Sequence, residues 1–334
     1  MKCDKLFKII TFLFSILSAQ TLEIEPNPGG PHEAFDMFSK YVNVHGVGIF
    51  SVSNVSDSKV LHAANVMAEY LDNNENGIPD NTSIINQMVE NNSSMVIFTS
   101  PWSNQIDQFF EVLESNPPNF ELAIQDLYGT EINPNFPINQ EFDATLEENL
   151  HLICFGGYSY VYPEQLGEWP GTDIADAMDI ARGGFFWNVP NQYPDEAWYH
   201  YDDTTCDYGC QITEYWYWAL TSLLGAQNYT WRCNWIADEW ELCSPEQVQT
   251  TDVAITEILT NPLFIFPTKL PDGTYFVRDL TGDGILTIDD VITLVDIMLD
   301  DTIPTDNQLS AGDVNSDSVI DVFDVVLLID IILL

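Results

Sequence analysis

The sequence predicts an α+β protein in which a helix-rich main domain, residues 34–270, precedes a small all-α domain with a duplicated loop–helix motif, residues 275–334. Stretches with helical periodicity alternate with short apolar runs through the main domain. A Pro-Asp-Gly turn at 271–273 then precedes a change of composition, after which the motif repeats. A chain of 334 residues suits two or three domains, and 46% hydrophobic residues suffice for folded cores.

The charge balance narrows the classes of partner. The chain contains 52 Asp and Glu residues but only 9 Lys and Arg residues, which gives a formal net charge of −43 at pH 7. Nucleic acids and anionic membrane surfaces bind clustered Lys and Arg, so both are excluded as general partners. A chain this acidic suits a salty or calcium-rich medium, because counterions screen its self-repulsion and divalent cations bind carboxylates.

The first twenty residues predict export. Three lysines, Lys2, Lys5 and Lys8, precede an apolar run at 9–17 and then small residues. This order is typical of a secretory signal peptide, here residues 1–19, whereas a membrane anchor needs about 20 apolar residues. We therefore expect a secreted, extracellular or cell-surface protein that has no membrane span after signal removal.

Local patterns in the main domain predict six helices and one strand. A Pro- and Gly-rich leader loop, residues 20–33, precedes them. The helices are expected from apolar spacings of three and four residues and, for the last one, from an N-cap Ser followed by Pro and Gln. A short apolar run at 94–100 predicts a buried strand. The predicted helices cover 57–71, 105–113, 143–154, 172–181, 211–224 and 244–259.

Two further features of this domain have structural interpretations. Arg182 ends the predicted helix at 172–181, and we expect it to pair with Asp179 or another buried carboxylate; binding a substrate carboxylate is the alternative. Four aromatic residues follow one another at 215–218 and must point all round a helix. This favours core packing over a sugar-stacking platform.

Five cysteines remain after the signal peptide, and an exported protein uses cysteines for disulfides by default. The simplest local pairs are Cys206 with Cys210 and Cys233 with Cys243, which leaves Cys154 free and buried. The alternative, a zinc site with four Cys ligands, fits the C-x₃-C and C-x₉-C spacings poorly. The sequence alone leaves the connectivity open.

The strongest signal is an Asp-rich loop–helix motif that occurs twice, 34 residues apart, beginning at Asp279 and at Asp313. Side-chain oxygens recur at loop positions 1, 3, 5, 9 and 12, and position 7 can supply a backbone carbonyl. A twelve-residue loop with this spacing gives Ca²⁺ the six to eight oxygens that it prefers. The alternative is two acidic, N-capped helices with solvated loops. The expected ligands are Asp279, Thr281, Asp283, Ile285, Thr287 and Asp290 in the first loop and Asp313, Asn315, Asp317, Val319, Asp321 and Asp324 in the second.

The duplicated loop–helix, the Asp at position 12 and the C-terminal location resemble a type I dockerin over about 56 residues. The resemblance implies two bound Ca²⁺ ions and docking to a cohesin-type module on a scaffold or surface protein. The chain departs from the family where Asp296 and Asp330 stand in helices that usually contain Lys or Arg, and where Ser318 replaces Gly at position 6. Thr281 at position 3 predicts weaker binding in the first loop. No helix is expected before either loop.

A third candidate calcium loop lies in the main domain, in the segment D-N-N-E-N-G-I-P-D that follows the predicted helix at 57–71. Gly77 matches position 6, whereas position 12 is Ser83. An Asn- and Gly-rich turn explains the segment equally well. The candidate ligands are Asp72, Asn74, Asn76, Ile78 through its carbonyl, and Asp80.

One predicted helix contains the candidate active site. Glu147 and His151 are four residues apart and share a helix face, while Glu148 lies one step around. The E-E-x-x-H pattern resembles the H-E-x-x-H helix of zincin metallopeptidases, with Glu147 in place of the first His. The resemblance implies Zn²⁺ held by Glu147 and His151, with Glu148 as the catalytic general base. The expected third ligand is His200 or Glu214.

The expected function is that of an exported calcium-binding protein in which a dockerin-like module follows a metal-dependent, peptidase-like hydrolase domain. A glycoside hydrolase or another component of polysaccharide degradation is one alternative, because dockerins often accompany such enzymes. A non-catalytic cell-surface binding protein is the other. In that case the two glutamates are solvated and His151 is hydrogen-bonded at a helix edge.

Overall fold

The computed structural model describes residues 22–299, 302–315 and 317–333, and the chain divides into two compact units. The main unit spans Thr21–Tyr275, and the C-terminal unit begins at Phe276. The predicted signal peptide lies outside the described residues. Helices and a five-stranded mixed sheet make the protein α+β, as the sequence predicts.

The sheet belongs to the N-terminal half of the main unit, and its strands follow one another in chain order. The first three are antiparallel neighbours, and the last two continue the sheet in parallel. Both residues of the turn at His45 and Gly46 have positive φ, as a two-residue type I′ hairpin requires. The strands are β1 (Glu25–Pro26), β2 (Lys40–Val44), β3 (Val47–Ser51), β4 (Ser94–Phe98) and β5 (Ile124–Tyr128).

The predicted leader loop is wrong at two points. Residues 25 and 26 pair with β2 as an edge strand, and a 3₁₀ helix begins at Glu33 and ends at Met37. Phe35 of this helix is fully buried and packs edge-on against Phe50 and Phe109. This aromatic burial holds the segment against the sheet, which the abundance of Pro and Gly does not indicate.

Helices connect the parallel strands, as parallel pairing requires. α1 (Asp57–Leu71) and α2 (Thr82–Glu90) lie between β3 and β4, and α3 (Asn104–Ser115) lies between β4 and β5. β3 and β4 are buried along their whole length, which explains their nearly continuous apolar sequences. The predictions of a helix at 57–71, a helix at 105–113 and a strand at 94–100 are confirmed.

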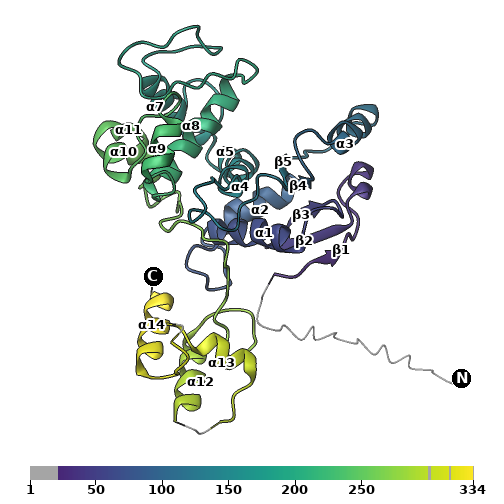
Figure 1. Ribbon diagram of the computed structural model, residues 1–334, viewed down its shortest axis with the longest axis vertical. Coiled ribbons are helices and arrows are strands. Elements are labelled where there is room, and N and C mark those ends of the chain that lie inside the picture. Colours follow the sequence, from purple (N-terminus) through teal and green to yellow (C-terminus); the bar gives the residue numbers. More distant parts are fainter. Residues whose placement is uncertain (1–21, 300–301, 316, 334) are drawn as a thin grey trace, which may run out of the picture. The chain divides into compact units, whose positions relative to one another are not determined.

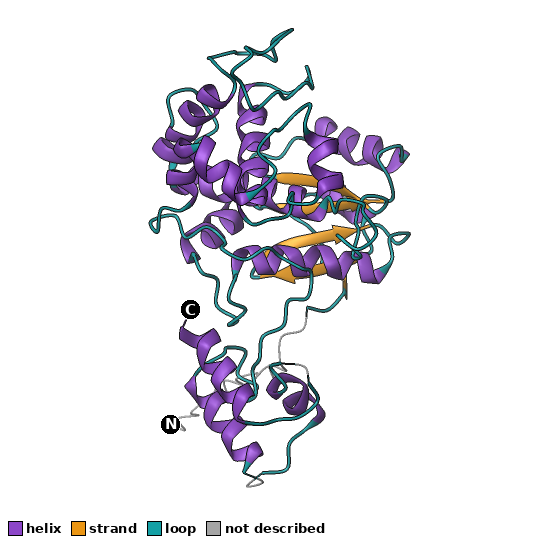
Figure 2. Cartoon of the chain, turned by 60° about the vertical axis from the view of Figure 1, so that its left-hand side comes forward, coloured by secondary structure: helices purple, strands orange, loops and turns teal. Residues whose placement is uncertain are grey.

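The remaining elements of the main unit are helical. Figure 1 shows α7 to α11 gathered away from the sheet, with α4 and α5 between the two groups, and Figure 2 shows the same division by secondary structure. These helices are α4 (Thr145–Ile153), α5 (Ser159–Val161), α6 (Pro163–Leu166), α7 (Asp173–Ala181), α8 (Tyr208–Leu223), α9 (Thr230–Ile236), α10 (Pro245–Thr251) and α11 (Val253–Leu259).

Two predicted helices have different boundaries, and in each case a buried Asp lies at the start of the observed helix. The helix predicted at 244–259 is broken at Asp252, whose carboxylate accepts a hydrogen bond from the Ile255 N–H and so starts α11. The helix predicted at 143–154 begins at Thr145, because the Asp143 carboxylate accepts from the Thr145 N–H and pairs with His62 at 2.6 Å.

Directly after α4, the chain departs from regular α-helical geometry. It continues as a π turn over Cys154–Tyr158, where a Cβ atom at Gly157 would lie 2.7 Å from the Ile84 side chain. Glycine therefore allows α2 to approach this turn closely.

The structure confirms several side-chain predictions. Cys206 is bonded to Cys210 and Cys233 to Cys243, and Cys154 is free and buried. Arg182 pairs with Asp179 at 2.7 Å. The four aromatic residues at 215–218 are all buried, as their all-round arrangement on α8 predicts.

The described residues of the C-terminal unit form three helices. α12 (Ile288–Met298) and α14 (Val322–Leu333) follow the two repeated loops and pack against each other. α13 (Asp306–Gly312) precedes the second loop, so the expectation that no helix precedes either loop is wrong there. A capping box between Thr305 and Gln308 starts α13 and is visible in the sequence as T-D-N-Q. Nowhere in the described parts of either unit is a helix both long and apolar enough to cross a membrane.

A buried carboxyl ties the end of the main unit to α1. The Glu69 side chain is 4% exposed, and its Oε2 accepts hydrogen bonds from the backbone N–H groups of Asp272 and Gly273, at 2.5 and 3.1 Å. Its Oε1 is buried without a partner. Burial raises the pKa of Glu69 from 4.5 to about 8, with the hydrogen bonds opposing the shift.

This shift predicts how stability depends on pH. Because the folded state binds the Glu69 proton more tightly than the unfolded state, its contribution to the free energy of unfolding is lost as pH rises from 4.5 to about 8. We expect Glu69→Gln to melt at a higher temperature than the wild type at pH 9, with a smaller difference at pH 5. Thermal unfolding at the two pH values measures this, with the exposed Glu90→Gln as a control for lost charge. Equal effects of both variants at pH 9 would refute it.

Candidate functional site

Contacts on α1 and on α8 determine how α4 presents its polar face. The Tyr70 hydroxyl donates to the Leu146 carbonyl, and the Asn149 side chain donates to the Ala63 carbonyl, both at 2.9 Å. The His151 ring meets the Tyr217 ring edge-on, with centroids 5.7 Å apart. α4 is thereby held between α1 and α8.

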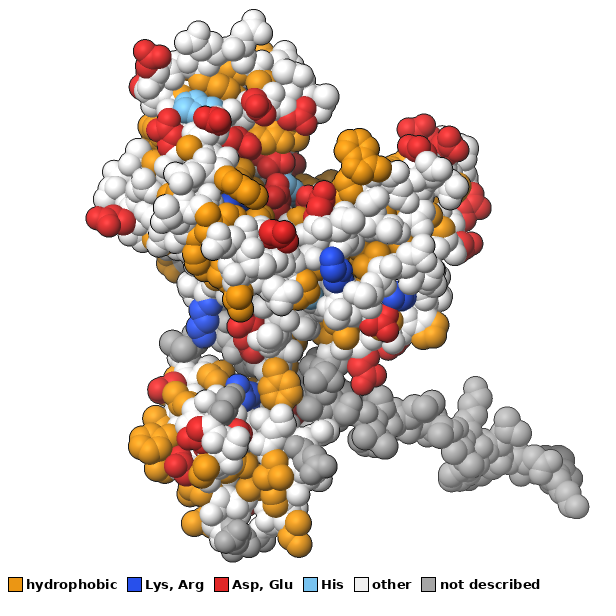
Figure 3. All heavy atoms as spheres, viewed as in Figure 1, with side chains coloured by type: hydrophobic (Ala, Val, Ile, Leu, Met, Phe, Trp, Pro, Cys, Tyr) orange, Lys and Arg blue, Asp and Glu red, His pale blue; other side chains and the backbone are white. Residues whose placement is uncertain are grey.

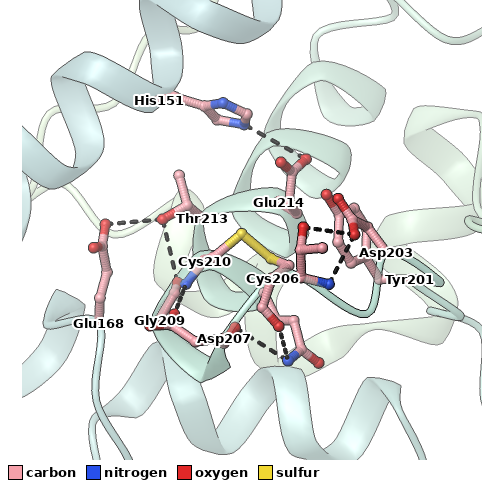
Figure 4. The surroundings of a disulfide bond; sticks show 12 residues. His151, Glu168, Tyr201, Asp203, Cys206, Asp207, Gly209, Cys210, Thr213 and Glu214 are labelled. Atoms are coloured by element: carbon pink, nitrogen blue, oxygen red, sulfur yellow. Dashed lines mark hydrogen bonds and ion pairs between the residues drawn. A yellow bond between two sulfur atoms is a disulfide. The ribbon is translucent and has the colours of Figure 1, made fainter. Parts of the chain in front are cut away.

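Three potential metal ligands meet at this junction. One ligand atom from each of Glu147, His151 and Glu214 lies within 4.8 Å of the others. His151 Nε2 is 3.6 Å from Glu214 Oε2, and Figure 4 shows the two side chains facing each other from different helices. His151 is 6% exposed, and its Nε2 is buried without a hydrogen-bond partner. An imidazole and two carboxylates are a donor set that Zn²⁺ accepts.

Each of the two carboxylates has a tyrosine partner. Tyr217 lies close enough to Glu147 to oppose the rise that burial gives the pKa of that carboxyl, and Glu214 lies close enough to Tyr201 to add to the rise that burial gives the pKa of that phenol. Arg232 in turn donates to the Tyr217 hydroxyl at 3.2 Å. Such outer partners orient ligating carboxylates in metal sites.

The local charge is strongly negative. Burial, followed by the nearby Glu148, raises the pKa of Glu147 to about 7, although His151 and Arg232 oppose the shift. Burial raises the pKa of Glu214 to about 8, against the effect of His151. Figure 3 shows acidic side chains gathered in a hollow of the main unit between α8 and β5. A divalent cation here would restore the ionised form of these carboxyls.

Glu148 lies on the other side of the imidazole. Its Oε2 is 3.3 Å from His151 Nδ1, the nitrogen that does not face Glu214, and accepts a hydrogen bond from Gln125 Nε2 at 2.6 Å. Burial, with Asp126 and Glu131 adding to it, raises the pKa of Glu148 to about 8. The Glu148 oxygen that approaches the ring therefore lies on its Nδ1 side, away from the nitrogen that faces Glu214.

His200, the other expected third ligand, lies elsewhere, and its prediction as a ligand is wrong. Its Nδ1 is 3.9 Å from Glu241, and it lines a separate cavity of about 600 Å³. The reason is the alternation of an extended segment: Tyr199 pairs with Trp240, and Tyr201 reaches Glu214. The residue between two such neighbours points to the opposite side.

Sequence reasoning missed Gln125, Tyr201 and Tyr217. Tyr217 had a local signal, because it lies three residues after Glu214 on the same helix. Gln125 and Tyr201 are distant from α4 in sequence, and no spacing rule links them to it. Glu168 was also missed; its carboxylate accepts a hydrogen bond from Thr213 at 2.9 Å (Figure 4). Burial raises the pKa of Glu168 to about 7, with His151 opposing the shift.

The three candidate calcium loops share one hydrogen-bond pattern. In each, the position-1 carboxylate accepts from the N–H groups of positions 5 and 6, and the position-5 side chain accepts from the N–H of position 7. Position 6 has positive φ in each loop, even at Ser318, where no glycine is present. The position-1 acceptors are Asp72, Asp279 and Asp313, and the position-5 acceptors are Asn76, Asp283 and Asp317.

The third loop differs at its end. In the two C-terminal loops, the position-12 carboxylates of Asp290 and Asp324 accept N–H groups from positions 2, 3 and 9. In the main unit, Asp80 at position 9 accepts the position-2 N–H of Asn73 at 2.8 Å. This loop also stands between two helices, α1 and α2, as an EF-hand loop does.

Comparison with known proteins gives no relative for this chain. No protein-family model matches it, and it has no significant match among curated proteins or among solved structures.

Proposed function

We propose that the main unit is a metal-dependent hydrolase whose divalent ion, Zn²⁺, is held by Glu147, His151 and Glu214. One observation carries the proposal: the buried His151 Nε2 has no hydrogen-bond partner and lies 3.6 Å from Glu214 Oε2, and one ligand atom from each of Glu147, His151 and Glu214 lies within 4.8 Å of the others. A buried polar atom without a partner is costly, and an ion at this point would satisfy it.

The surroundings of the three side chains also support an ion. Tyr217 lies close to Glu147 and Tyr201 lies close to Glu214, and Arg232, which is 9% exposed, donates a hydrogen bond to Tyr217. Three protein ligands leave a fourth position for water, which is typical of catalytic zinc sites. An ion bound there would supply a nucleophilic water at neutral pH and polarise a carbonyl. The resemblance of E-E-x-x-H to the zincin helix favours a peptide or related bond as the substrate.

A glycoside hydrolase is the second candidate, and the same pair of carboxylates favours it. Glu147 and Glu214 lie within the separation of about 5 Å that is typical of retaining glycosidases. In this case, burial raises the pKa values of both carboxyls, as a general acid requires. The unpartnered His151 Nε2 is explained by the metal site but not by a glycosidase, so we favour the metal site.

We further propose that the repeated loops bind two Ca²⁺ ions and that the loop beginning at Asp72 binds a third. The shared pattern of hydrogen bonds supports this, because it gives all three loops the same backbone turn around the position-1 carboxylate, as a calcium loop requires. The C-terminal unit would then act as a dockerin-like module that docks to a cohesin-type partner. Exposed apolar side chains on α12 and α14, among them Ile292, Phe323 and Val326, support a docking role.

Secretion completes the proposal. Two disulfides in the main unit require an oxidising compartment to form and persist. The signal peptide that the sequence predicts would deliver the chain to one.

The metal centre gives a first test. We expect His151→Ala to lower the affinity for Zn²⁺ by more than about 100-fold, beyond the loss typical of outer-shell partners, and to abolish Zn²⁺-dependent cleavage of a peptide substrate. Competition with a chromophoric chelator measures the affinity. His200→Ala is the matched control and should bind Zn²⁺ as the wild type does, because His200 lines a different cavity. Loss of binding in His200→Ala but not in His151→Ala would contradict the assignment. Glycan hydrolysis that survives chelation would favour the second candidate.

Calcium stoichiometry gives a second test. Isothermal titration of the full chain should give three Ca²⁺ ions, one for each loop. Because loss of a ligand charge weakens a calcium site, we expect Asp72→Asn to leave two and the double variant Asp279→Asn/Asp313→Asn to leave one. Asp107→Asn, an exposed change on α3 outside the loops, should leave three. Absence of calcium binding to the wild type would refute the proposal.

A further inference from the structure

The two nitrogens of the His151 ring have different surroundings. Nε2 faces Glu214 at 3.6 Å and has no hydrogen-bond partner, whereas Nδ1 lies 3.3 Å from Glu148 Oε2. When Glu148 is ionised, its oxygens can only accept, so this contact is then a hydrogen bond in which Nδ1 carries the proton. Neutral imidazole with its proton on Nδ1 has its lone pair on Nε2, the side on which the two glutamates lie.

Glu148 is itself held from a second element. Its Oε2 accepts a hydrogen bond from Gln125 Nε2 at 2.6 Å, and Gln125 belongs to β5, an edge strand paired in parallel with β4. The contacts from Gln125 to Glu148 and from Glu148 to His151 therefore connect the sheet to α4. Gln125 Nε2 can only donate a hydrogen bond. Glu148 Oε2 can therefore accept from Gln125 and also from the proton on His151 Nδ1.

We propose that Gln125 and Glu148 are positioning residues that set the His151 tautomer and direct Nε2 to the metal, and that Glu148 is not the general base. The inference rests on the proposed metal centre. In known metal sites, a ligating His commonly donates its other ring N–H to a carboxylate, which orients the ring and increases its basicity as a ligand. The Glu148 oxygen that approaches the imidazole already has two partners, on the side of the ring away from the triad.

Variants of the full chain separate the two roles of Glu148. We expect Glu148→Leu and Gln125→Leu to lower Zn²⁺ affinity about 10- to 100-fold, the range typical of outer-shell partners. Glu148→Gln keeps a neutral acceptor and should lose less affinity than Glu148→Leu. Glu131→Gln is the control, because it removes a charge close to Glu148 without contacting the ring. Circular dichroism and thermal unfolding of the metal-free variants check that each is folded.

A spectroscopic measurement tests the tautomer without metal. Nitrogen-15 NMR of the metal-free wild type at a pH above about 8, where Glu148 is ionised, should show a proton on Nδ1, and Glu148→Leu should shift the population towards the Nε2-protonated form. A wild-type ring protonated on Nε2 would overturn the proposal. A second pattern would also overturn it. If Glu148→Leu and Gln125→Leu both bind Zn²⁺ as tightly as the wild type, and only the Glu148 variants lose hydrolysis, Glu148 acts as a general base. If the wild type binds no Zn²⁺, the proposed metal centre fails, while the NMR result still decides the role of the pair.

Discussion

The candidate site depends on how α4 is held between α1 and α8. Hydrogen bonds from Tyr70 and Asn149 fix the helix against α1, and the edge-on contact of His151 with Tyr217 fixes it against α8. With both contacts in place, the i and i+4 side chains of α4 face Glu214 across the junction. Burial at this junction, together with the neighbouring carboxyls, raises the pKa values of Glu147 and Glu214, and a cation bound there would favour their ionised forms.

The chain uses carboxylates in two structural contexts that favour different ions. The junction of α4 and α8 combines two carboxylates with an imidazole nitrogen, a donor set suited to a transition metal such as Zn²⁺. The three loops offer oxygen atoms alone, arranged by backbone hydrogen bonds to Asp72, Asp279 and Asp313, which suits Ca²⁺. A net charge of −43 is consistent with a protein that functions with several bound cations.

Local patterns predicted most of the helices and part of the site, and long-range contacts explain the rest. The helix at 57–71 has the boundaries that its periodicity predicts, and Glu147 and His151 share a face as their spacing requires. The choice between His200 and Glu214 depended on which way an extended segment alternates, and that was set by its pairing with Trp240. The role of Gln125 required knowing that β5 lies beside α4. No sequence spacing contains that information.

A crystal structure of the zinc-loaded protein, with data collected on both sides of the zinc absorption edge, tests the central claim most directly. The account predicts one anomalous peak between Glu147, His151 and Glu214, with the ion about 2.0–2.2 Å from His151 Nε2 and from an oxygen of each glutamate. A peak bound instead to His151 Nδ1, a peak in the cavity lined by His200, or no peak on the main unit would contradict the account.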